Sequence, residues 1–135
     1  MLPIYHSDVP LHCVNEAAIE FTVPAKLIIA ILNVERGKVG QSVRNKNGTY
    51  DLGPMQVNTR WLPELKSYSI TQYDIQYNPC INVKVGAWIL AKAIASDDDF
   101  LKGVGNYNSH TSWINKHYSE KVKIYYTRIN LILQQ

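Results

Sequence analysis

Residues 24–36 read PAKLIIAILNVER, and their pattern predicts an amphipathic helix that carries one unusual side chain. Its apolar residues recur three or four positions apart and therefore share one face: Leu27, Ile28, Ile31 and Leu32. The next position on that face is Glu35, so the helix directs a carboxylic acid along its own hydrophobic side. Gly37 follows and is predicted to end the helix, as a glycine commonly does.

A carboxyl group on an apolar face loses hydration, which disfavours its charged form. We therefore expect burial to raise the pKa of Glu35 and to keep this side chain protonated near neutral pH. A general acid requires such a group. The periodicity alone leaves a simpler role open, in which Glu35 points to water at the helix end or pairs with Arg36 or Lys38.

Residues 47–58, NGTYDLGPMQVN, open on a turn signal that predicts a short β-hairpin around Asn47-Gly48. The segment places a second acid, Asp51, among polar neighbours that would keep it ionised by hydrogen bonding: Asn47, Thr49 and Gln56. One neutral and one charged carboxyl group form the arrangement that glycoside cleavage uses. Taken alone, Asp51 reads equally well as a turn acid bonded to local backbone.

The remainder of the chain is predicted to be largely helical. Apolar residues at helical spacing predict helices over residues 10–21, 70–77, 82–96 and 113–133. Three consecutive acids, Asp97–Asp99, are suited to capping a further short helix, and residues 103–110, GVGNYNSH, are predicted to form a loop. The expected fold class is mainly α, of the α+β type, with a helical domain and a small β-hairpin or turn region.

The 135 residues suit a single domain, 1–135, and contents of 46% apolar and 19% charged residues indicate an ordinary packed chain. The formal charge of +3 is scattered without a basic run, which argues against a nucleic-acid partner. The longest apolar run, residues 27–32, is far shorter than the ~20 residues that cross a bilayer, so we expect no membrane span. The N-terminal stretch MLPIYHSDVPLHC has neither the basic flank nor the apolar core of a secretory signal.

Cys13 and Cys80 are the two cysteines of the chain, and the sequence alone leaves them either as free thiols or as a disulfide. The four histidines show no ligand spacing with these cysteines or with one another, so we expect no metal site. The chain contains no P-loop, dinucleotide-binding or nucleophile-elbow motif. We therefore expect no metal and no organic cofactor.

Several segments, taken in order, resemble the lytic transglycosylases of the soluble-lysozyme-like (SLT) superfamily. They are the helix ending in Glu35, then NGTYDLGPMQVN (47–58), NPCINVKVGAWIL (78–90), GNYNSH (105–110) and YSEKVKIYY (118–126). The resemblance covers about residues 10–130 and points to the small one-domain members that accompany conjugation, type IV pilus and secretion machines. It implies a lysozyme-like helical domain with a central catalytic helix.

The resemblance also implies roles for individual residues. Glu35 matches the catalytic acid of the family, and residues 53–58, GPMQVN, match a Gly-Leu-Met-Gln segment that lines the sugar cleft. This match implies that four residues contact substrate: Gly53, Met55, Gln56 and Asn58. Tyr107 and Asn108 match a Tyr-Asn pair in which the tyrosine lies near the catalytic acid and the asparagine contacts substrate.

Two further features follow from likeness to known proteins. The segment around Asp51 also looks like animal c-type lysozymes, whose second carboxylate falls at this position, and this makes Asp51 the expected second catalytic residue. Cys13 and Cys80 stand where secretion-associated members of the superfamily also carry cysteines, which favours a disulfide between them.

Three residues depart from the pattern of the superfamily. Arg36 replaces the serine that usually follows the catalytic glutamate, Pro54 replaces a Leu or Ile, and Asn106 replaces the alanine before the Tyr-Asn pair. Pro54 also removes a backbone donor beside the cleft. Arg36 and Pro54 favour an alternative in which the chain is a non-catalytic, wall-binding scaffold subunit.

The resemblance implies a peptidoglycan lytic transglycosylase that cleaves the β-1,4 bond between N-acetylmuramic acid and N-acetylglucosamine. It would open the cell wall locally for a secretion, conjugation or pilus apparatus. A lysozyme-type muramidase acting on the same bond is the alternative enzyme. We expect peptidoglycan strands and proteins of such an apparatus as partners, and a monomer in the periplasm or at the cell surface. We also expect that residues 1–135 contain no signal peptide.

Overall fold

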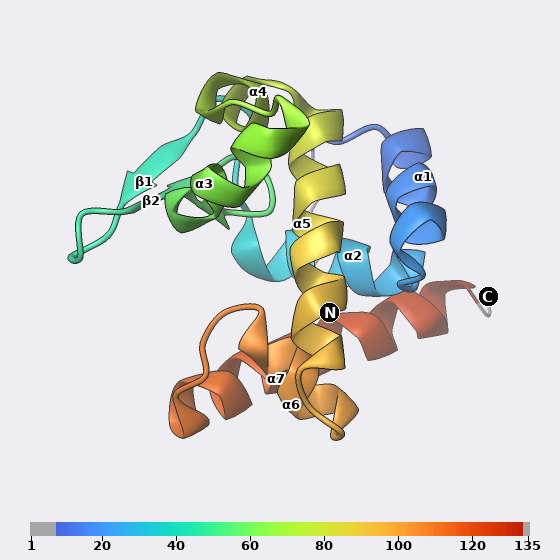
Figure 1. Ribbon diagram of the computed structural model, residues 1–135. Coiled ribbons are helices and arrows are strands. Elements are labelled where there is room, and N and C mark those ends of the chain that lie inside the picture. The colour runs from blue at the N-terminus through green and yellow to red at the C-terminus, as the bar shows by residue number, and fades with distance from the viewer. Residues whose placement is uncertain (1–7, 134–135) are drawn as a thin grey trace.

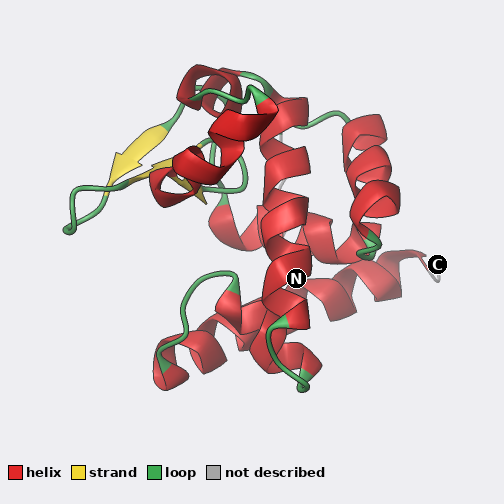
Figure 2. Ribbon diagram, viewed as in Figure 1, coloured by secondary structure: helices red, strands yellow, loops and turns green. Residues whose placement is uncertain are grey.

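The computed structural model describes residues 8–133, and helices make up most of it (Figures 1 and 2). The helices are α1 (Leu11–Phe21), α2 (Ala25–Glu35), α3 (Leu62–Leu65), α4 (Gln72–Tyr77), α5 (Pro79–Ala95), α6 (Phe100–Asn106) and α7 (Ser112–Leu133). Two 3-10 turns, η1 (Thr59–Trp61) and η2 (Lys66–Tyr68), flank α3. Strands β1 (Ser42–Arg44), β2 (Tyr50–Leu52) and β3 (Val57–Asn58) form one antiparallel sheet in that order. The expected mainly α fold with a small β region is confirmed.

Helix α5 runs through the middle of the molecule, with α1 beside it and with α6 and α7 near its C-terminal end (Figure 1). Helix α2 packs against both α1 and α7 and lies deep in the core, where four of its residues have no exposed surface: Ile28, Ala30, Ile31 and Asn33. The sheet projects to one side, away from α1 (Figure 2). None of the described helices is long and apolar enough to cross a membrane.

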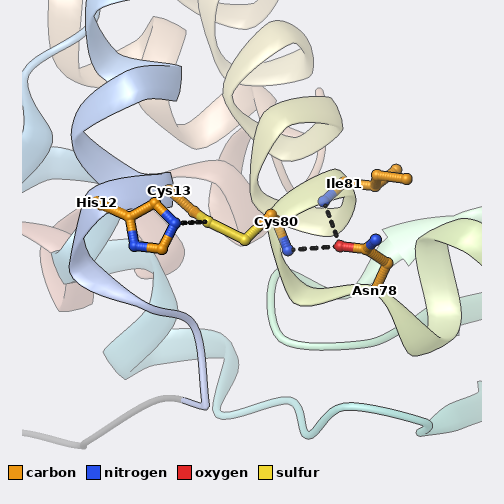
Figure 3. Close-up of a disulfide and its surroundings, with 5 residues drawn as sticks. All are labelled: His12, Cys13, Asn78, Cys80 and Ile81. Atoms are coloured by element: carbon orange, nitrogen blue, oxygen red, sulfur yellow. Dashed lines mark hydrogen bonds between the residues drawn. A yellow bond between two sulfur atoms is a disulfide. The ribbon is translucent and has the colours of Figure 1, made fainter.

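Helix α5 begins at Pro79, before the expected residue 82, because Asn78 caps it. The Asn78 Oδ1 accepts hydrogen bonds from the backbone N–H groups of Cys80 (3.0 Å) and Ile81 (3.1 Å) (Figure 3). Cys80 in this first turn forms a disulfide with Cys13 of α1, and their Cα atoms lie 5.2 Å apart. The disulfide that the resemblance favoured is therefore present. On the chain-entropy model a cross-link over such a long loop stabilises the fold by about 4 kcal/mol.

The expected loop at residues 103–110 is wrong in its first half, because α6 continues to Asn106. Asp99 caps this helix by accepting a hydrogen bond from a backbone N–H of the first turn, as the acidic triplet predicted. Gly103 serves helix packing: a Cβ at this position would lie 2.8 Å from the Cα of Ile94. A glycine that resembles a loop signal therefore allows α5 and α6 to approach closely.

The expected hairpin is present as β1 and β2, and its turn contains Gly48 with φ +84°. Strand β3 was not expected from the sequence. It pairs with β2 so that Asp51 faces Asn58 and Leu52 faces Val57. The β region is therefore a three-stranded sheet, and its third strand places an amide side chain next to Asp51.

The turn between β2 and β3 explains why a proline is favourable at position 54. The backbone N–H of Gln56 donates to the carbonyl of Gly53 at 3.0 Å, which closes a turn with Pro54 at its second position. The fixed φ of proline suits this position of a β-turn. Pro54 therefore preorganises the turn, which offsets the donor that it removes.

A buried asparagine of α5, Asn82, holds the same turn in place. Its Nδ2 donates to the carbonyl groups of Leu52 (2.9 Å) and Ile75 (3.0 Å), and its Oδ1 accepts from the backbone N–H of Met55 (2.9 Å). Asn82 has no exposed surface, so water cannot replace these bonds. One side chain thus joins the sheet, the end of α4 and helix α5.

We predict that Asn82→Ala lowers the free energy of unfolding by about 3 kcal/mol or more, because it leaves buried backbone groups of three residues unpaired. Asn130→Ala is the matched control. Asn130 is partly exposed and accepts one hydrogen bond, from Lys26 at 2.9 Å, so its loss should cost below about 1 kcal/mol. Urea unfolding followed by circular dichroism measures both; equal losses in the two variants would contradict the assigned role of Asn82.

Candidate active site

Helix α2 ends at Glu35, and Arg36 turns the chain by taking the left-handed conformation with φ 54°. The prediction that Gly37 ends the helix by such a turn is therefore wrong. Gly37 is needed for close approach instead, because a Cβ on it would collide with the carbonyl oxygen of Gly53 and lie 2.8 Å from Gln56 Nε2. The C-terminal end of α2 consequently lies directly against the turn between β2 and β3.

Glu35 stands at the end of the apolar face of α2, and Tyr118 of α7 reaches it from the other side. The Tyr118 hydroxyl donates to Glu35 Oε2 at 2.7 Å. The residue as a whole is partly exposed, but burial of its carboxyl group dominates and raises the pKa of Glu35 to about 7. The Tyr118 hydrogen bond and the charge of Lys121 oppose this rise in pKa, whereas the charge of Asp51 adds to it. Near neutral pH the Glu35 carboxyl is therefore poised between its two forms.

Two buried tyrosines form the wall behind Glu35. The rings of Tyr107 and Tyr118 are stacked with centroids 6.4 Å apart, and the two residues are 9% and 6% exposed. The Tyr107 hydroxyl donates to the carbonyl of Met55 at 2.8 Å, which links α6 to the turn between β2 and β3. Burial, with the nearby charge of Glu35, raises the pKa of both tyrosines well above its usual value. They remain neutral donors throughout the range in which Glu35 titrates.

Asp51 lies on β2 in a polar setting, opposite in character to the site of Glu35. The Asn58 Nδ2 donates to Asp51 Oδ1 at 3.0 Å and also to Thr49 Oγ1 at 3.0 Å. The sequence placed Asn47, Thr49 and Gln56 around Asp51; the direct donor is Asn58, because strand pairing sets it opposite. The carboxylate is thus oriented by the sheet itself.

A cavity of about 270 Å³ lies between the end of α2, the sheet and the residues that directly follow α6. Most of the residues predicted for the site line it together: Glu35, Asp51, Gln56, Asn58, Tyr107 and Asn108. Other polar and aromatic residues complete the wall: Asn45, Asn47, Thr49, Arg60 and Trp61. The cavity therefore presents one carboxyl of raised pKa, one hydrogen-bonded carboxylate and many amide and hydroxyl groups, a lining suited to a sugar.

Two predicted substrate contacts, Gly53 and Met55, lie behind the cavity wall. The Met55 side chain is fully buried and packs against Gly86 of α5, where a Cβ would overlap it. A Cβ on Gly53 would clash with Asn82, so this glycine is set by packing. Gln56 lines the cavity and donates from Nε2 to the Gly53 carbonyl at 3.0 Å.

Sequence reasoning gave no site role to Tyr118, Arg60 and Trp61. Tyr118 received no role from the sequence, although it opens the segment YSEKVKIYY (118–126). Arg60 and Trp61 follow β3 directly, and their presence at the cavity depends on that unexpected strand. No spacing rule in a single sequence connects these positions with Glu35.

Residues 12–126 of the chain match the sequence profile of the transglycosylase SLT domain. The chain belongs to this family. It is 33% identical over 130 residues to the "Peptidoglycan-binding-like protein" of Escherichia coli O157:H7, an alignment that covers 87% of this chain and 78% of the relative. It is 34% identical over 115 residues to "Invasion protein IagB" of Salmonella typhimurium, with 82% and 72% covered. "Protein IpgF" of Shigella flexneri is 29% identical over 122 residues, with 87% and 80% covered.

Membership of the SLT family fits the position of Glu35. Four of the five segments from which the resemblance was drawn, far apart in the sequence, line one cavity, and the fifth supplies Tyr118, which bonds Glu35. Arg36 and Pro54, which depart from the family pattern, act on the backbone: Arg36 is exposed at the turn after α2, and Pro54 is buried in the turn after β2. Neither residue lines the cavity.

His12 lies closer to the cysteines than the sequence indicated. Its Nε2 is 3.4 Å from Cys13 Sγ, and the possible ligand atoms of His12, Cys13 and Cys80 all lie within 4.8 Å of one another (Figure 3). A thiolate is the form of cysteine that binds metal. Because both sulfur atoms are joined in the disulfide, this cluster offers no thiolate ligand.

We predict that Tyr118→Phe raises the pKa of Glu35 further, because the lost hydrogen bond lowers that pKa. Tyr125→Phe, on the same helix and partly exposed, is the control and should leave it unchanged. NMR titration of the Glu35 carboxyl carbon measures both values. A lower pKa in Tyr118→Phe would show that the assigned hydrogen bond does not favour the ionised form.

The raised pKa also predicts a pH-dependent stability. Between pH 4.5 and about 7 the folded state holds a proton on Glu35 that the unfolded state releases, so the free energy of unfolding falls as pH rises through this window. The size of this effect is up to about 3 kcal/mol. The parent should lose this stability between pH 4.5 and 7 while Glu35→Gln does not, which urea unfolding at several pH values measures.

Proposed function

We propose that this chain is a peptidoglycan lytic transglycosylase that cleaves the β-1,4 bond between N-acetylmuramic acid and N-acetylglucosamine. The observation that carries the proposal is Glu35, whose pKa is raised to about 7 in a polar cavity that Asp51 also lines. A protonated and an ionised carboxyl group in unlike environments supply the acid and the charge stabilisation that glycoside cleavage needs. The family match supports the substrate class.

In the first step Glu35 donates its proton to the glycosidic oxygen as the bond from this oxygen to C1 of the muramyl residue breaks. The departing N-acetylglucosamine keeps the proton as a hydroxyl group. Positive charge develops at C1 and is stabilised by the carboxylate of Asp51, which Asn58 holds in place. The neutral Tyr118 keeps the Glu35 carboxyl oriented through its 2.7 Å hydrogen bond.

In the second step the Glu35 carboxylate removes the proton of the muramyl C6 hydroxyl, whose oxygen bonds to C1. The product is a 1,6-anhydro end, and Glu35 regains its proton for the next cycle. A pKa close to neutral suits a group that must serve as acid and then as base.

A second enzyme function, a muramidase, is favoured by Asp51. A carboxylate at this position stabilises the charge at C1 for attack by water as well as by the C6 hydroxyl, and water gives a reducing end. The name of the Escherichia coli relative, "Peptidoglycan-binding-like protein", favours a third function, a scaffold that binds the wall without cutting it. The presence of cleavage activity and the type of end on the products distinguish these three functions.

We further propose that the enzyme opens the cell wall locally for a secretion, conjugation or pilus apparatus, as a monomer of one domain in the periplasm or at the cell surface. The relative named "Invasion protein IagB" supports a link to such a machine. The disulfide between Cys13 and Cys80 supports an oxidising compartment, because cytosolic thiols are kept reduced. The net charge of +3 suits an anionic wall polymer.

We predict that Glu35→Gln lowers peptidoglycan cleavage by about 10²- to 10⁴-fold, because the amide can neither donate nor accept the reacting proton. Glu16→Gln, which changes an exposed glutamate of α1 in the same way, is the control and should cleave at the parental rate. Zymography on purified peptidoglycan and mass spectrometry of the released muropeptides provide the readouts. We expect anhydro ends, which weigh one water less than reducing ends. Reducing ends alone would establish the muramidase, and no cleavage by the parent would favour the scaffold.

Asp51→Asn should reduce the rate on the order of 100-fold by removing the charge that stabilises the transition state. It should also lower the pKa of Glu35, since the charge of Asp51 raises that pKa, and so move the alkaline limb of the pH–rate profile to lower pH. Asp98→Asn, an exposed acid outside the cavity, is the control. An unchanged rate and profile for Asp51→Asn would reduce Asp51 to a structural residue of the sheet.

A further inference from the structure

Arg60 is the one cationic side chain among the described residues that line the cavity. It lies on η1, directly after β3, and its backbone N–H donates to Asn58 Oδ1 at 2.9 Å. This bond fixes the start of η1 to the same asparagine that orients Asp51. The cation and the catalytic carboxylate are therefore carried by neighbouring, hydrogen-bonded elements.

Aromatic rings support the Arg60 guanidinium group. Its Cζ lies 5.5 Å from the ring centroid of Trp61, which also lines the cavity. Trp61 in turn meets Trp88 of α5 edge to face, with centroids 5.5 Å apart. These contacts limit the positions of the Arg60 side chain, so a ligand that binds it loses less side-chain entropy than on a free surface arginine.

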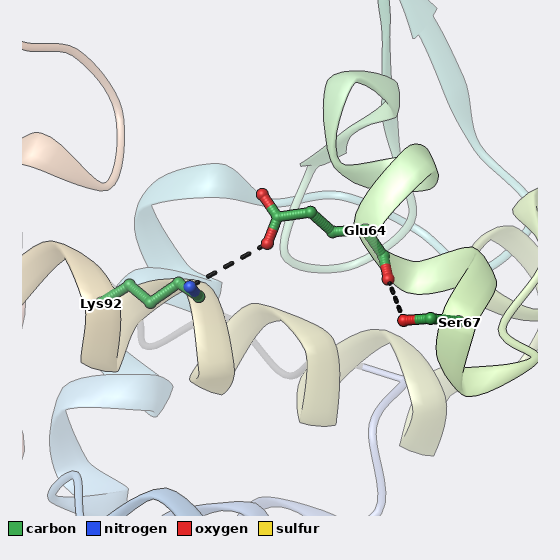
Figure 4. Close-up of polar contacts among 3 residues, drawn as sticks. All are labelled: Glu64, Ser67 and Lys92. Atoms are coloured by element: carbon green, nitrogen blue, oxygen red, sulfur yellow. Dashed lines mark hydrogen bonds and ion pairs between the residues drawn. The ribbon is translucent and has the colours of Figure 1, made fainter.

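The neighbouring cation on α5 is already engaged. Lys92 Nζ lies 4.7 Å from the Trp88 ring centroid. It also lies 4.0 Å from Glu64 Oε2 of α3, and the Glu64 backbone carbonyl accepts a hydrogen bond from Ser67 (Figure 4). Arg60, in contrast, forms no ion pair among the residues that the structure describes, although Asp51 lines the same cavity. Its five N–H donors are arranged to hold a carboxylate with two parallel hydrogen bonds.

We propose that Arg60, supported by Trp61, forms a subsite for a carboxylate of the glycan strand. The inference rests on the proposed function, since the muramyl residue differs from glucosamine by a lactyl ether that ends in a carboxyl group. In peptide-free strands this carboxyl is ionised. In peptide-bearing strands it is an amide, and the nearest carboxylates belong to the stem peptide. Both sources offer the same chemistry to Arg60.

Binding without turnover tests the subsite. The Glu35→Gln protein is titrated calorimetrically with three probes: peptide-free oligosaccharides of N-acetylglucosamine and N-acetylmuramic acid, the same oligosaccharides with the lactyl carboxyl converted to a methylamide, and peptide-bearing strands. We expect the carboxylate to improve binding over the methylamide on the order of 3- to 10-fold at low salt. Adding Arg60→Gln should abolish this difference, whereas Arg44→Gln, which changes another exposed arginine outside the cavity, should keep it.

The probes also distinguish the lactyl carboxyl from the stem peptide as the source of the carboxylate, and they test the subsite separately from the proposed function. If peptide-bearing strands bind more tightly than the methylamide, and Arg60→Gln removes that gain, the stem peptide supplies the carboxylate and the subsite stands. Equal binding of carboxylate and methylamide, with no gain for peptide-bearing strands, overturns the subsite while the proposed function remains. Failure of all three probes to bind overturns the proposed function itself, and with it the subsite.

Discussion

The cavity of the candidate active site depends on the side-chain amide of Asn82. This amide has no exposed surface and satisfies two carbonyl groups and one N–H group that belong to other parts of the chain. Through it helix α5 determines where the sheet lies, and the sheet carries Asp51. The constraint is strict because Gly53 packs so closely on Asn82 that no side chain fits there. A small sheet that could not bury a core of its own is thus positioned by a helix.

Opposing effects then set the chemistry of Glu35. Burial disfavours the ionised carboxylate, whereas the Tyr118 hydrogen bond favours it, and burial is the larger effect. A fully apolar pocket would hold the proton so firmly that the group could not act as a base, and a solvated one would release it too early. The hydrogen bond from α7 offsets part of the desolvation penalty. Helix packing between α2 and α7 thereby tunes proton affinity.

Sequence periodicity could predict that Glu35 lies on the apolar face of its helix, because this face is a local property that four preceding residues define. The sequence could predict that Asp51 lies among polar neighbours. It could not predict that Asn58 donates a hydrogen bond to Asp51, since the pairing of β2 with β3 is a property of the tertiary fold. Tyr118 lies 83 positions from Glu35 along the chain, and no periodicity reports such a contact. The prediction of a loop at residues 103–110 failed for a related reason. Gly103 is required for close packing against α5 and not for a special local backbone conformation.

Charge in the cavity links substrate recognition to the protonation of Glu35. With Glu35 protonated, the charged lining residues are Asp51 and Arg60, which balance. Ionisation of Glu35 adds a negative charge, so an anionic strand binds better to the protonated form. By reciprocity a bound carboxylate raises the pKa of Glu35, and in the proposed reaction this keeps the proton in place until the glycosidic oxygen accepts it. In this proposal Arg60 does more than select the substrate. It binds the substrate carboxylate, and the negative charge of that carboxylate keeps Glu35 protonated.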